Sequence, residues 1–218
     1  MNWSVFFEPY ELVVQELKIN LRGIRKQYKT KGLHSPIEYI NGRIKTIASI
    51  VDKLERLGLS FDEIDKIYDI AGIRINCQFV EDIYMVVELL KKRQDLDIVE
   101  TRDYIENQRP SGYRSYHIHG YYHLETIDGV KKVMVEFQIR TLAMNFWASI
   151  EHSLNYKYNG EIPEVIKERL KQAAEAASWL DRQMSGIRDE ISEAQKTFEQ
   201  RHLDEMMISF NKGEMEIK

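Results

Sequence analysis

The sequence has few cysteines and no long apolar run, and each shortage excludes a class of protein. Cys77 is the one cysteine among 218 residues, which excludes an internal disulfide and a cysteine-based zinc site. It lies in the segment GIRINCQF, so we predict a small buried hydrophobic residue rather than a nucleophile. No apolar run approaches 18 residues, and the first residues carry acids where a signal peptide carries bases. We therefore expect no membrane span and a cytoplasmic location.

The chain also carries little net charge. The formal net charge is -4, so the chain has no global basic field that would attract nucleic acid or anionic lipid. Any site for an anion has to be a local arrangement of cations. With 43% apolar and 30% charged residues, the length suits one large or two small globular domains with a real core.

Several familiar catalytic motifs do not occur. We find no G-x-x-x-x-G-K-[ST], G-x-G-x-x-G, H-E-x-x-H or G-x-S-x-G motif, and no His-Asp doublet of metal phosphohydrolases. His117, His119 and His123 could indicate zinc, but ligands spaced by two on a strand with no supporting acid or cysteine pair make this interpretation weak. The chain still offers many cations and two well-placed carboxylates, Asp69 and Glu136. Together they suit a Mg²⁺-dependent reaction on phosphates.

The N-terminal third predicts two helices. In the first, from Tyr10 to about Tyr28, apolar residues recur at helical spacing. No acidic residue occurs between Leu17 and Ile37. One side of this helix carries a basic stripe formed by Lys18, Arg22, Arg25 and Lys29. The stripe is either a solvated face or an anion site.

The capping-box spacing Ser35-Pro36-Ile37-Glu38 predicts the start of the second helix. Its expected buried positions are Ile40, Ile44, Ile47, Val51 and Leu54. Lys45, Ser49 and Lys53 recur at successive fours on the other side, with Arg43 a turn away. This arrangement suits a phosphate, although exposed lysines alone would look the same.

After Gly58 the pattern predicts short strands alternating with helices. We expect strands at 70–79, 96–105, 116–125 and 131–140, and a helix at 81–93. This centre favours a mixed sheet with helices on one side, an α+β fold.

The last two strands form a predicted hairpin. If Asp128-Gly129 is its two-residue turn, His117 lies opposite Arg140, and His119 lies opposite Gln138. Tyr121 then lies opposite Glu136. One surface would hold all six of these acidic, basic and hydrogen-bonding side chains, as in the floor of a site.

The C-terminal third predicts two further helices. The first follows Thr141 and places Asn145, Ser149, His152 and Tyr156 on one side. The second carries a heptad seam of apolar residues from Ile166 to Phe198 and would reach roughly 50 Å. Part of it must pack on the N-terminal helices or on another subunit, so we expect a homo-oligomer. The tail from residue 201 has no clean period and is expected to be mobile.

Five motifs occur in order between about residues 40 and 160. They are Arg43-x-Lys45-x-x-x-Ser49-x-x-x-Lys53, Asp69-x-x-Gly72-x-Arg74, Gly112-Tyr113-Arg114-Ser115-Tyr116-His117, Val135-Glu136-Phe137-Gln138-Ile139-Arg140-Thr141, and Trp147-Ala148-x-x-Glu151-His152-x-x-x-Tyr156-Lys157. In this order they resemble the synthetase domain of the alarmone (p)ppGpp synthetases. Because the chain is short and has no hydrolase signature, it is most similar to the single-domain small alarmone synthetases of the tetrameric kind.

The resemblance implies a nucleotidyltransferase-like fold and a reaction. ATP donates pyrophosphate to the 3′-hydroxyl of GTP or GDP, giving AMP and pppGpp or ppGpp. One synthetase domain would fill residues 1–218, with N-terminal helices at 1–58, a catalytic core at 59–160, the long helix at 161–200 and a tail at 201–218.

The family's motifs assign roles residue by residue. Glu136 would be the general base, with Mg²⁺ held by Asp69 and Glu136. The ATP site would consist of Arg43, Lys45, Ser49, Lys53 and Arg74, with the two arginines sandwiching adenine. Tyr113 would stack on guanine, His117 would reach the phosphates, and Asn145 would read the base edge. Gln138 completes that acceptor site, and Arg102 and Arg109 would contact the 5′-phosphates.

Two regulatory interpretations accompany the resemblance. A catalytically weak protein of the same fold could sense nucleotides or RNA, although the presence of both Asp69 and Glu136 favours an enzyme. In tetrameric relatives a cleft between subunits binds pppGpp or ppGpp as an activator and single-stranded RNA as an inhibitor. The expected counterpart here is formed by Lys18, Arg22, Arg25, Tyr39 and Asn41.

Overall fold

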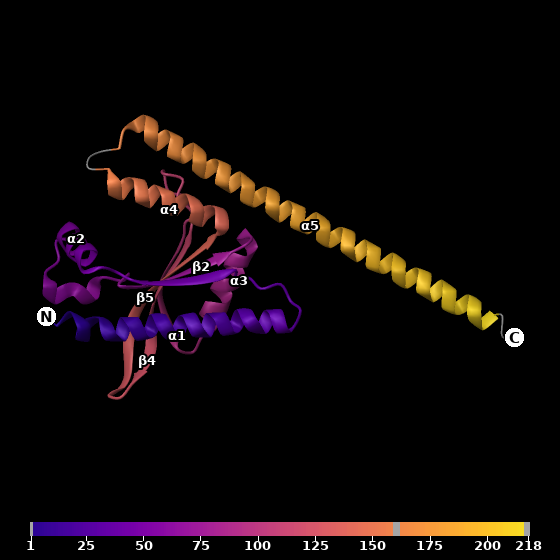
Figure 1. The fold of residues 1–218 in the computed structure, drawn as a ribbon, viewed down its shortest axis with the longest axis horizontal. Helices are drawn as coiled ribbons and strands as arrows, with labels where there is room; N and C mark the ends of the chain where they lie inside the picture. The colour runs from indigo at the N-terminus through magenta and orange to yellow at the C-terminus, as the bar shows by residue number, and fades with distance from the viewer. Residues whose placement is uncertain (1, 159–161, 216–218) are drawn as a thin grey trace.

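The fold is a mixed five-stranded sheet with helices around it and one very long C-terminal helix (Figure 1). This computed structural model describes residues 2–158 and 162–215, and the side chains of 2–154, 158 and 162–200. In chain order the elements are α1 (Trp3–Thr30), β1 (Tyr39–Ile44), α2 (Ile47–Leu57), the 3₁₀ helix η1 (Phe61–Lys66), β2 (Ala71–Cys77), α3 (Val80–Lys91), β3 (Leu96–Asp103), β4 (Tyr116–Thr126), β5 (Gly129–Thr141), α4 (Leu142–Lys157) and α5 (Glu164–Met215).

The sheet has the order β1-β2-β5-β4-β3. β2 and β5 are parallel, and the other neighbouring pairs are antiparallel, which confirms the expected mixed sheet. Residues such as Ile73, Phe137 and Ile118 alternate onto one face and form the main core with α1 and α3. In Figure 1, α4 and α5 lie above the strands, whereas α1 crosses them and the β4–β5 hairpin extends below it. The helix predicted within the central segment, α3, packs on the core face of the sheet.

The segment predicted to open the second helix is a strand instead. Residues 39–44 form β1, an edge strand that pairs antiparallel with β2. Ile40 and Ile44 are four residues apart, a spacing that fits both the helical and the strand period, so the pattern alone could not decide. The helix begins only at Ile47, where the Thr46 side chain accepts a hydrogen bond from the Ser49 amide.

The β4–β5 hairpin exists, but its register differs by two residues from the prediction. The turn residues are Ile127 and Asp128, because Thr126 pairs with Gly129. The Thr126 hydroxyl stabilises this turn by donating to the Gly129 carbonyl at 2.8 Å. The observed pairs are His117 with Gln138, His119 with Glu136 and Tyr121 with Met134. A shift of two preserves the alternation, so the predicted set of side chains still shares one face.

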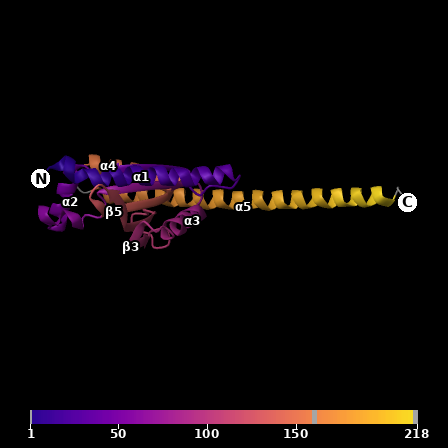
Figure 2. The ribbon, with the colours of Figure 1, turned by 90° about the horizontal axis from the view of Figure 1, so that it is seen from below.

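The C-terminal helix is longer than predicted. It runs for 52 residues to Met215, about 78 Å at 1.5 Å per residue, and projects well beyond the rest of the molecule (Figure 2). The tail expected from residue 201 is thus helical to Met215, and the side chains after residue 200 lie outside the described set. α5 packs on α4 and α3 rather than on the N-terminal helices as one expectation had it. None of the described helices is long and apolar enough to cross a membrane.

Candidate active site

Glu136 lies at the centre of a buried polar cluster on the sheet face opposite the main core. His117 Nδ1 and His119 Nε2 lie 3.1 and 3.3 Å from its Oε1 atom. Gln138 Nε2 donates to the other carboxylate oxygen, Oε2, at 2.8 Å. All four residues are less than a tenth exposed. Strand alternation and the β4–β5 pairing bring these side chains together. The sequence predicts that they share one face of the sheet, but it does not predict the register in which they pair.

The surroundings of Glu136 favour its ionised form. Burial alone would raise its pKa, but the hydrogen bonds from His117 and His119 outweigh burial and hold the pKa well below its usual value. Burial lowers the pKa of His117 despite its bond to Glu136. For His119, burial is outweighed by the bonds to Glu136 and Glu100, and the pKa is raised. Glu136 is thus ionised, with its negative charge stabilised by the two histidines.

Asp69 lies just before β2 and is held between two lysines. Lys45 Nζ donates to Oδ2 at 2.9 Å, and Lys53 Nζ donates to Oδ1 at 2.7 Å. Lys45 lies between β1 and α2, and Lys53 lies on α2. Burial would raise the pKa of Asp69, but the two lysine hydrogen bonds lower it overall. The predicted lysine pair therefore does converge, although Lys45 is not on the helix.

The positions of the two carboxylates follow from strand pairing. β2 runs parallel to β5 with Gly72 opposite Glu136, and Asp69 precedes Gly72 by three residues. Asp69 itself lies in the turn before β2, which begins at Ala71. Each carboxylate has its own cationic or hydrogen-bonding neighbours. A common divalent ion on Asp69 and Glu136 stays a prediction.

A cavity of about 460 Å³ opens beside this cluster and is rich in arginines. Its lining comes from β1, β2, the loop before β4, β5 and α4, and includes Arg43, Arg74, Arg109, Tyr113, Gln138, Arg140, Ser149 and His152. Gln138 Oε1 accepts from Arg74 Nε at 3.2 Å and from Arg140 Nη2 at 2.9 Å. Burial lowers the pKa of Arg74, and the neighbouring Arg43 and Arg140 charges lower it further. A pocket with this excess of guanidinium groups suits a polyphosphate.

Tyr113 joins the cavity to the Glu136 cluster. Its hydroxyl lies 2.8 Å from His117 Nε2 and accepts from Arg140 Nη2 at 2.7 Å. Gly112 precedes it with φ of 83°, a left-handed conformation that favours glycine. The guanidinium of Arg109 lies 5.3 Å from the Tyr113 ring and 4.2 Å from the Tyr104 ring.

Other predicted residues lie around the edge of the site. Arg102 Nε pairs with Glu100 at 2.8 Å, and Asn145 Nδ2 reaches the Tyr39 hydroxyl at 3.5 Å. Ser49 accepts from the Thr46 hydroxyl in the first turn of α2, one turn before Lys53. Tyr156, predicted on the same side of α4 as Asn145, lies outside the described side chains.

The residues predicted to bind a regulator do not share one surface of the chain. Lys18, Arg22 and Arg25 lie on α1, and Arg25 pairs with Glu38 at 3.2 Å. A Cβ atom at Gly42 would meet the Lys18 side chain, so Gly42 faces α1. Alternation then directs Tyr39 and Asn41 to the opposite face of β1. A regulatory site made of all five residues would need more than one chain.

Sequence reasoning did not assign roles to four residues that the structure places in or beside the site. They are His119, Arg140, Glu100 and Tyr104. His119 and Arg140 lay on the predicted polar face, so strand alternation was the available signal. Glu100 reaches His119 from β3 at 3.2 Å, a contact that requires knowledge of which strands are neighbours.

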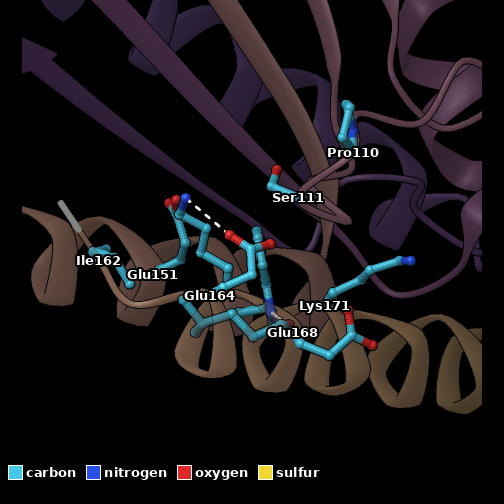
Figure 3. A pocket seen from close by; sticks show the side chains of 10 residues that line it. Pro110, Ser111, Glu151, Ile162, Glu164, Glu168 and Lys171 are labelled. Carbon is cyan, nitrogen blue, oxygen red and sulfur yellow. Dashed lines mark hydrogen bonds and ion pairs between the residues drawn. The ribbon is translucent and has the colours of Figure 1, made fainter.

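A second cavity, of about 330 Å³, lies next to the arginine-rich one (Figure 3). Ser111 and Glu151 line both cavities, and the first turns of α5 complete the second. In Figure 3, Pro110 and Ser111 on the loop lie across from Glu164, Glu168 and Lys171 of α5. Trp147 Nε1 donates to the Leu170 carbonyl at 2.8 Å, which ties α4 to α5 at this point.

Comparison with known proteins identifies the family. A family model described as the region found in RelA / SpoT proteins matches residues 42–161. The GTP pyrophosphokinase YjbM of Bacillus subtilis (strain 168) is 55% identical over 197 residues, which are 90% of this chain and 93% of that protein. The chain belongs to the RelA/SpoT family. Within it, the chain is also similar to the GTP pyrophosphokinase YwaC of the same organism, at 40% identity over 87% of this chain and 92% of the relative.

Solved structures agree with this assignment. The crystal structure of small alarmone synthetase 1 from Bacillus subtilis bound to its product pppGpp has a TM-score of 0.83 and 55% identity. The match covers 87% of this chain and 97% of that one. The same synthetase bound to AMPCPP has a TM-score of 0.78 and 51% identity, covering 88% and 98% of the two chains. The expected synthetase fold of the small RelA/SpoT members is thereby confirmed.

Proposed function

We propose that this RelA/SpoT family member is a GTP pyrophosphokinase. It transfers the β,γ-pyrophosphate of ATP to the 3′-hydroxyl of GTP or GDP, and so makes pppGpp or ppGpp and AMP in the stringent response. The names and ligands of its relatives support this activity. The observation that carries the proposal is the ionised, buried Glu136 beside an arginine-rich cavity. Both substrates are nucleotides of the cytoplasm, which is where we place the protein.

Glu136 is our candidate for the general base. A ribose hydroxyl is a poor nucleophile at neutral pH and needs an acceptor for its proton. Hydrogen bonds from two histidines and Gln138 fix the carboxylate in place, so little reorganisation is required when the hydroxyl arrives. In this role the proton moves from the 3′-hydroxyl to a Glu136 oxygen. The ribose 3′-oxygen then bonds to the β-phosphorus of ATP, the bond from that phosphorus to the α-phosphate oxygen breaks, and AMP leaves.

In this proposal one set of side chains binds ATP, the pyrophosphate donor, and another set binds GTP or GDP, the pyrophosphate acceptor. Lys45, Lys53 and Arg74 neutralise the migrating pyrophosphate together with His117, and Ser49 donates a hydrogen bond to the same phosphates. Arg43 and Arg74 hold the adenine between their guanidinium planes. On the acceptor side Tyr113 stacks on guanine, Asn145 and Gln138 bind the nucleotide, and Arg102 and Arg109 contact its 5′-phosphates.

Mg²⁺ is the cofactor that the donor set fits best. Asp69 and Glu136 are both carboxylates with lowered pKa values, and Mg²⁺ is usually bound by one or two carboxylates plus substrate phosphates. When bound there it would neutralise charge on the transferred group. The lysines on Asp69 would then serve the phosphates instead.

Two further proposals concern assembly and regulation. We propose a homotetramer that uses the exposed apolar side of α5, and a site for pppGpp, ppGpp or single-stranded RNA formed by the basic stripe of α1 with Tyr39 and Asn41. The placement of those residues on opposite faces of β1 supports a site shared between chains.

The activity proposal is tested by Glu136→Gln. Because the amide keeps the shape but cannot accept the proton, we expect the rate of product formation to fall by about 10²–10⁴-fold. The measurement follows labelled pyrophosphate from ATP to GTP in the presence of Mg²⁺. Glu125→Gln, an exposed change on the same hairpin, should leave the rate unchanged. Wild-type protein that makes no product, or undiminished product from Glu136→Gln, would reject the assignment.

A further inference from the structure

Three side chains around Glu136 are arranged as the ligands of a transition metal are. One nitrogen from His117, one from His119 and one oxygen of Glu136 all lie within 4.8 Å of one another. The two nitrogen–oxygen distances are 3.1 and 3.3 Å. Ligands at about 2.0–2.1 Å from a tetrahedral zinc ion are roughly 3.3 Å apart. The cluster therefore already has about the dimensions of a three-ligand metal site.

We propose that His117, His119 and Glu136 bind a transition-metal dication, with Zn²⁺ as the representative ion, and that its binding inhibits pyrophosphate transfer. The proposed metal site rests on geometry alone. Its inhibitory effect rests on the proposed function, because the ion would occupy the carboxylate that has to accept the ribose proton.

The outer partners of both histidines support ligation. His119 presents Nε2 to Glu136, and its Nδ1 lies 3.2 Å from Glu100 Oε2. His117 presents Nδ1 to Glu136, and its Nε2 lies 2.8 Å from the Tyr113 hydroxyl. A metal-binding histidine usually bonds a carboxylate or another polar group through its second nitrogen, which fixes the ring and its tautomer. Both rings here are held in that way.

The ligand types select against Mg²⁺ at this position. Two imidazoles and one carboxylate are the protein ligands of His₂Glu zinc sites, whereas Mg²⁺ favours oxygen ligands. The three residues are at most 9% exposed, so few waters compete for the ion. In the sequence alone, the strand histidines have no supporting acid. Pairing of β4 with β5 supplies that acid, since His119 lies opposite Glu136.

The interpretation to be excluded is a purely hydrogen-bonded cluster in which protons occupy the space between the three groups. Such a cluster would fix Glu136 and bind no metal. The two interpretations differ in a measurement that needs neither substrate nor catalysis.

The first experiment titrates Co²⁺ into the untagged full-length protein without nucleotide and records the visible absorption of low-coordinate Co²⁺. We expect one ion per chain, displaced by Zn²⁺. His119→Gln should weaken Co²⁺ binding by about tenfold or more, and Glu100→Gln, which removes only an outer partner, by about 10- to 100-fold. His123→Gln is the matched control because His123 lies on the same strand but pairs with Asp97 at 2.8 Å. It should bind like wild type.

Circular dichroism of each variant checks that the fold is retained. A wild-type protein without the Co²⁺ bands, or a folded His119→Gln variant with wild-type Co²⁺ affinity, would overturn the metal site.

The second experiment measures product formation at a fixed excess of Mg²⁺ while Zn²⁺ is raised. Wild type and His123→Gln should lose activity over the Zn²⁺ range in which the metal binds. Full activity with the site saturated would overturn the inhibitory role. If wild type has no activity even without Zn²⁺, the proposed function fails, while the Co²⁺ titration still decides the metal site.

Discussion

At the scale of single residues, two buried carboxyl groups show how hydrogen bonding decides charge in this protein. Burial penalises ionisation of both Glu136 and Asp181. At Glu136 the hydrogen bonds and charges of His117 and His119 outweigh burial, and the pKa is lowered. At Asp181 the partners are the Thr141 hydroxyl, which donates at 2.8 Å, and the charge of Arg114, and the pKa is raised. The pKa values of two buried carboxyl groups near the same sheet are therefore shifted in opposite directions.

The raised pKa of Asp181 predicts a pH-dependent stability. A carboxyl whose pKa is raised on folding stabilises the fold while it is protonated, and this contribution is lost as pH rises from the ordinary value near 4 through the raised one. Asp181→Asn keeps an oxygen for Thr141 without the charge. We expect the variant to be more stable than wild type by about 1 kcal/mol or less at pH 7. Thermal unfolding at several pH values measures this.

The difference between Asp181→Asn and wild type should shrink as the pH approaches 4. Glu190→Gln, an exposed change on the same helix, provides the control. Equal or lower stability of Asp181→Asn at pH 7 would show that the buried charge is compensated.

The residue types of the site could be predicted from sequence, but some of their neighbours could not. Asp69, Lys45 and Lys53 are all predicted at the phosphates because the family's motifs carry that information, but the direct Asp69–lysine ion pairs are not predicted. Arg140 and His119 were placed on the polar face without a role. Glu100 could not be connected to the site because it comes from β3, and sequence patterns do not say which strands are neighbours.

At the scale of elements, the strands with strict alternation were predicted well, and the ambiguous segment was not. β2, β4 and β5 alternate apolar and polar residues and lie close to their expected positions. β1 failed because Ile40 and Ile44 satisfy two periods at once and the preceding Ser-Pro-Ile-Glu resembles a helix start. Pairing with β2 and packing on α1 decide its conformation.

The packing of α1 on β1 leads to a prediction at Gly42. A Cβ atom there would collide with Val14 Cγ1 and lie 3.0 Å from Lys18 Cδ. Gly42→Ala should therefore push the two elements apart and destabilise the protein by about 1–3 kcal/mol, measured by chemical denaturation.

The control for Gly42→Ala is Gly23→Ala in α1, the helix that packs on β1, where a Cβ atom would meet nothing within 4 Å. Removing a helical glycine should stabilise the protein by about 0.5–1 kcal/mol. A neutral result at Gly42 would mean that α1 shifts without cost.

At the scale of the whole molecule, contacts within the chain account for only one side of the long helix α5. Its small and polar residues Ala174, Ser178, Asp181 and Ser185 are buried. The predicted seam lies elsewhere on the helix, with Leu180, Met184, Ile187 and Ile191 between 45 and 54% exposed. The sequence could predict the seam because it is a local period, but its partner is not determined by local spacing. An apolar stripe of this length favours an interface with other copies.

This stripe supports the last prediction, which concerns assembly. Ile191→Glu places a charge in the seam of α5 and should dissociate the proposed tetramer, because an unpaired charge is costly in an apolar interface. Light scattering coupled to size exclusion measures the molar mass, which should fall from four times 25.8 kDa for wild type towards a single chain. Ile127→Glu, at the fully exposed tip of the β4–β5 hairpin, makes the same chemical change away from the stripe and should leave the mass unchanged. If Ile191→Glu keeps the wild-type mass, the chains associate through another surface. If wild type itself is a monomer, no second chain covers the apolar stripe of α5 in solution.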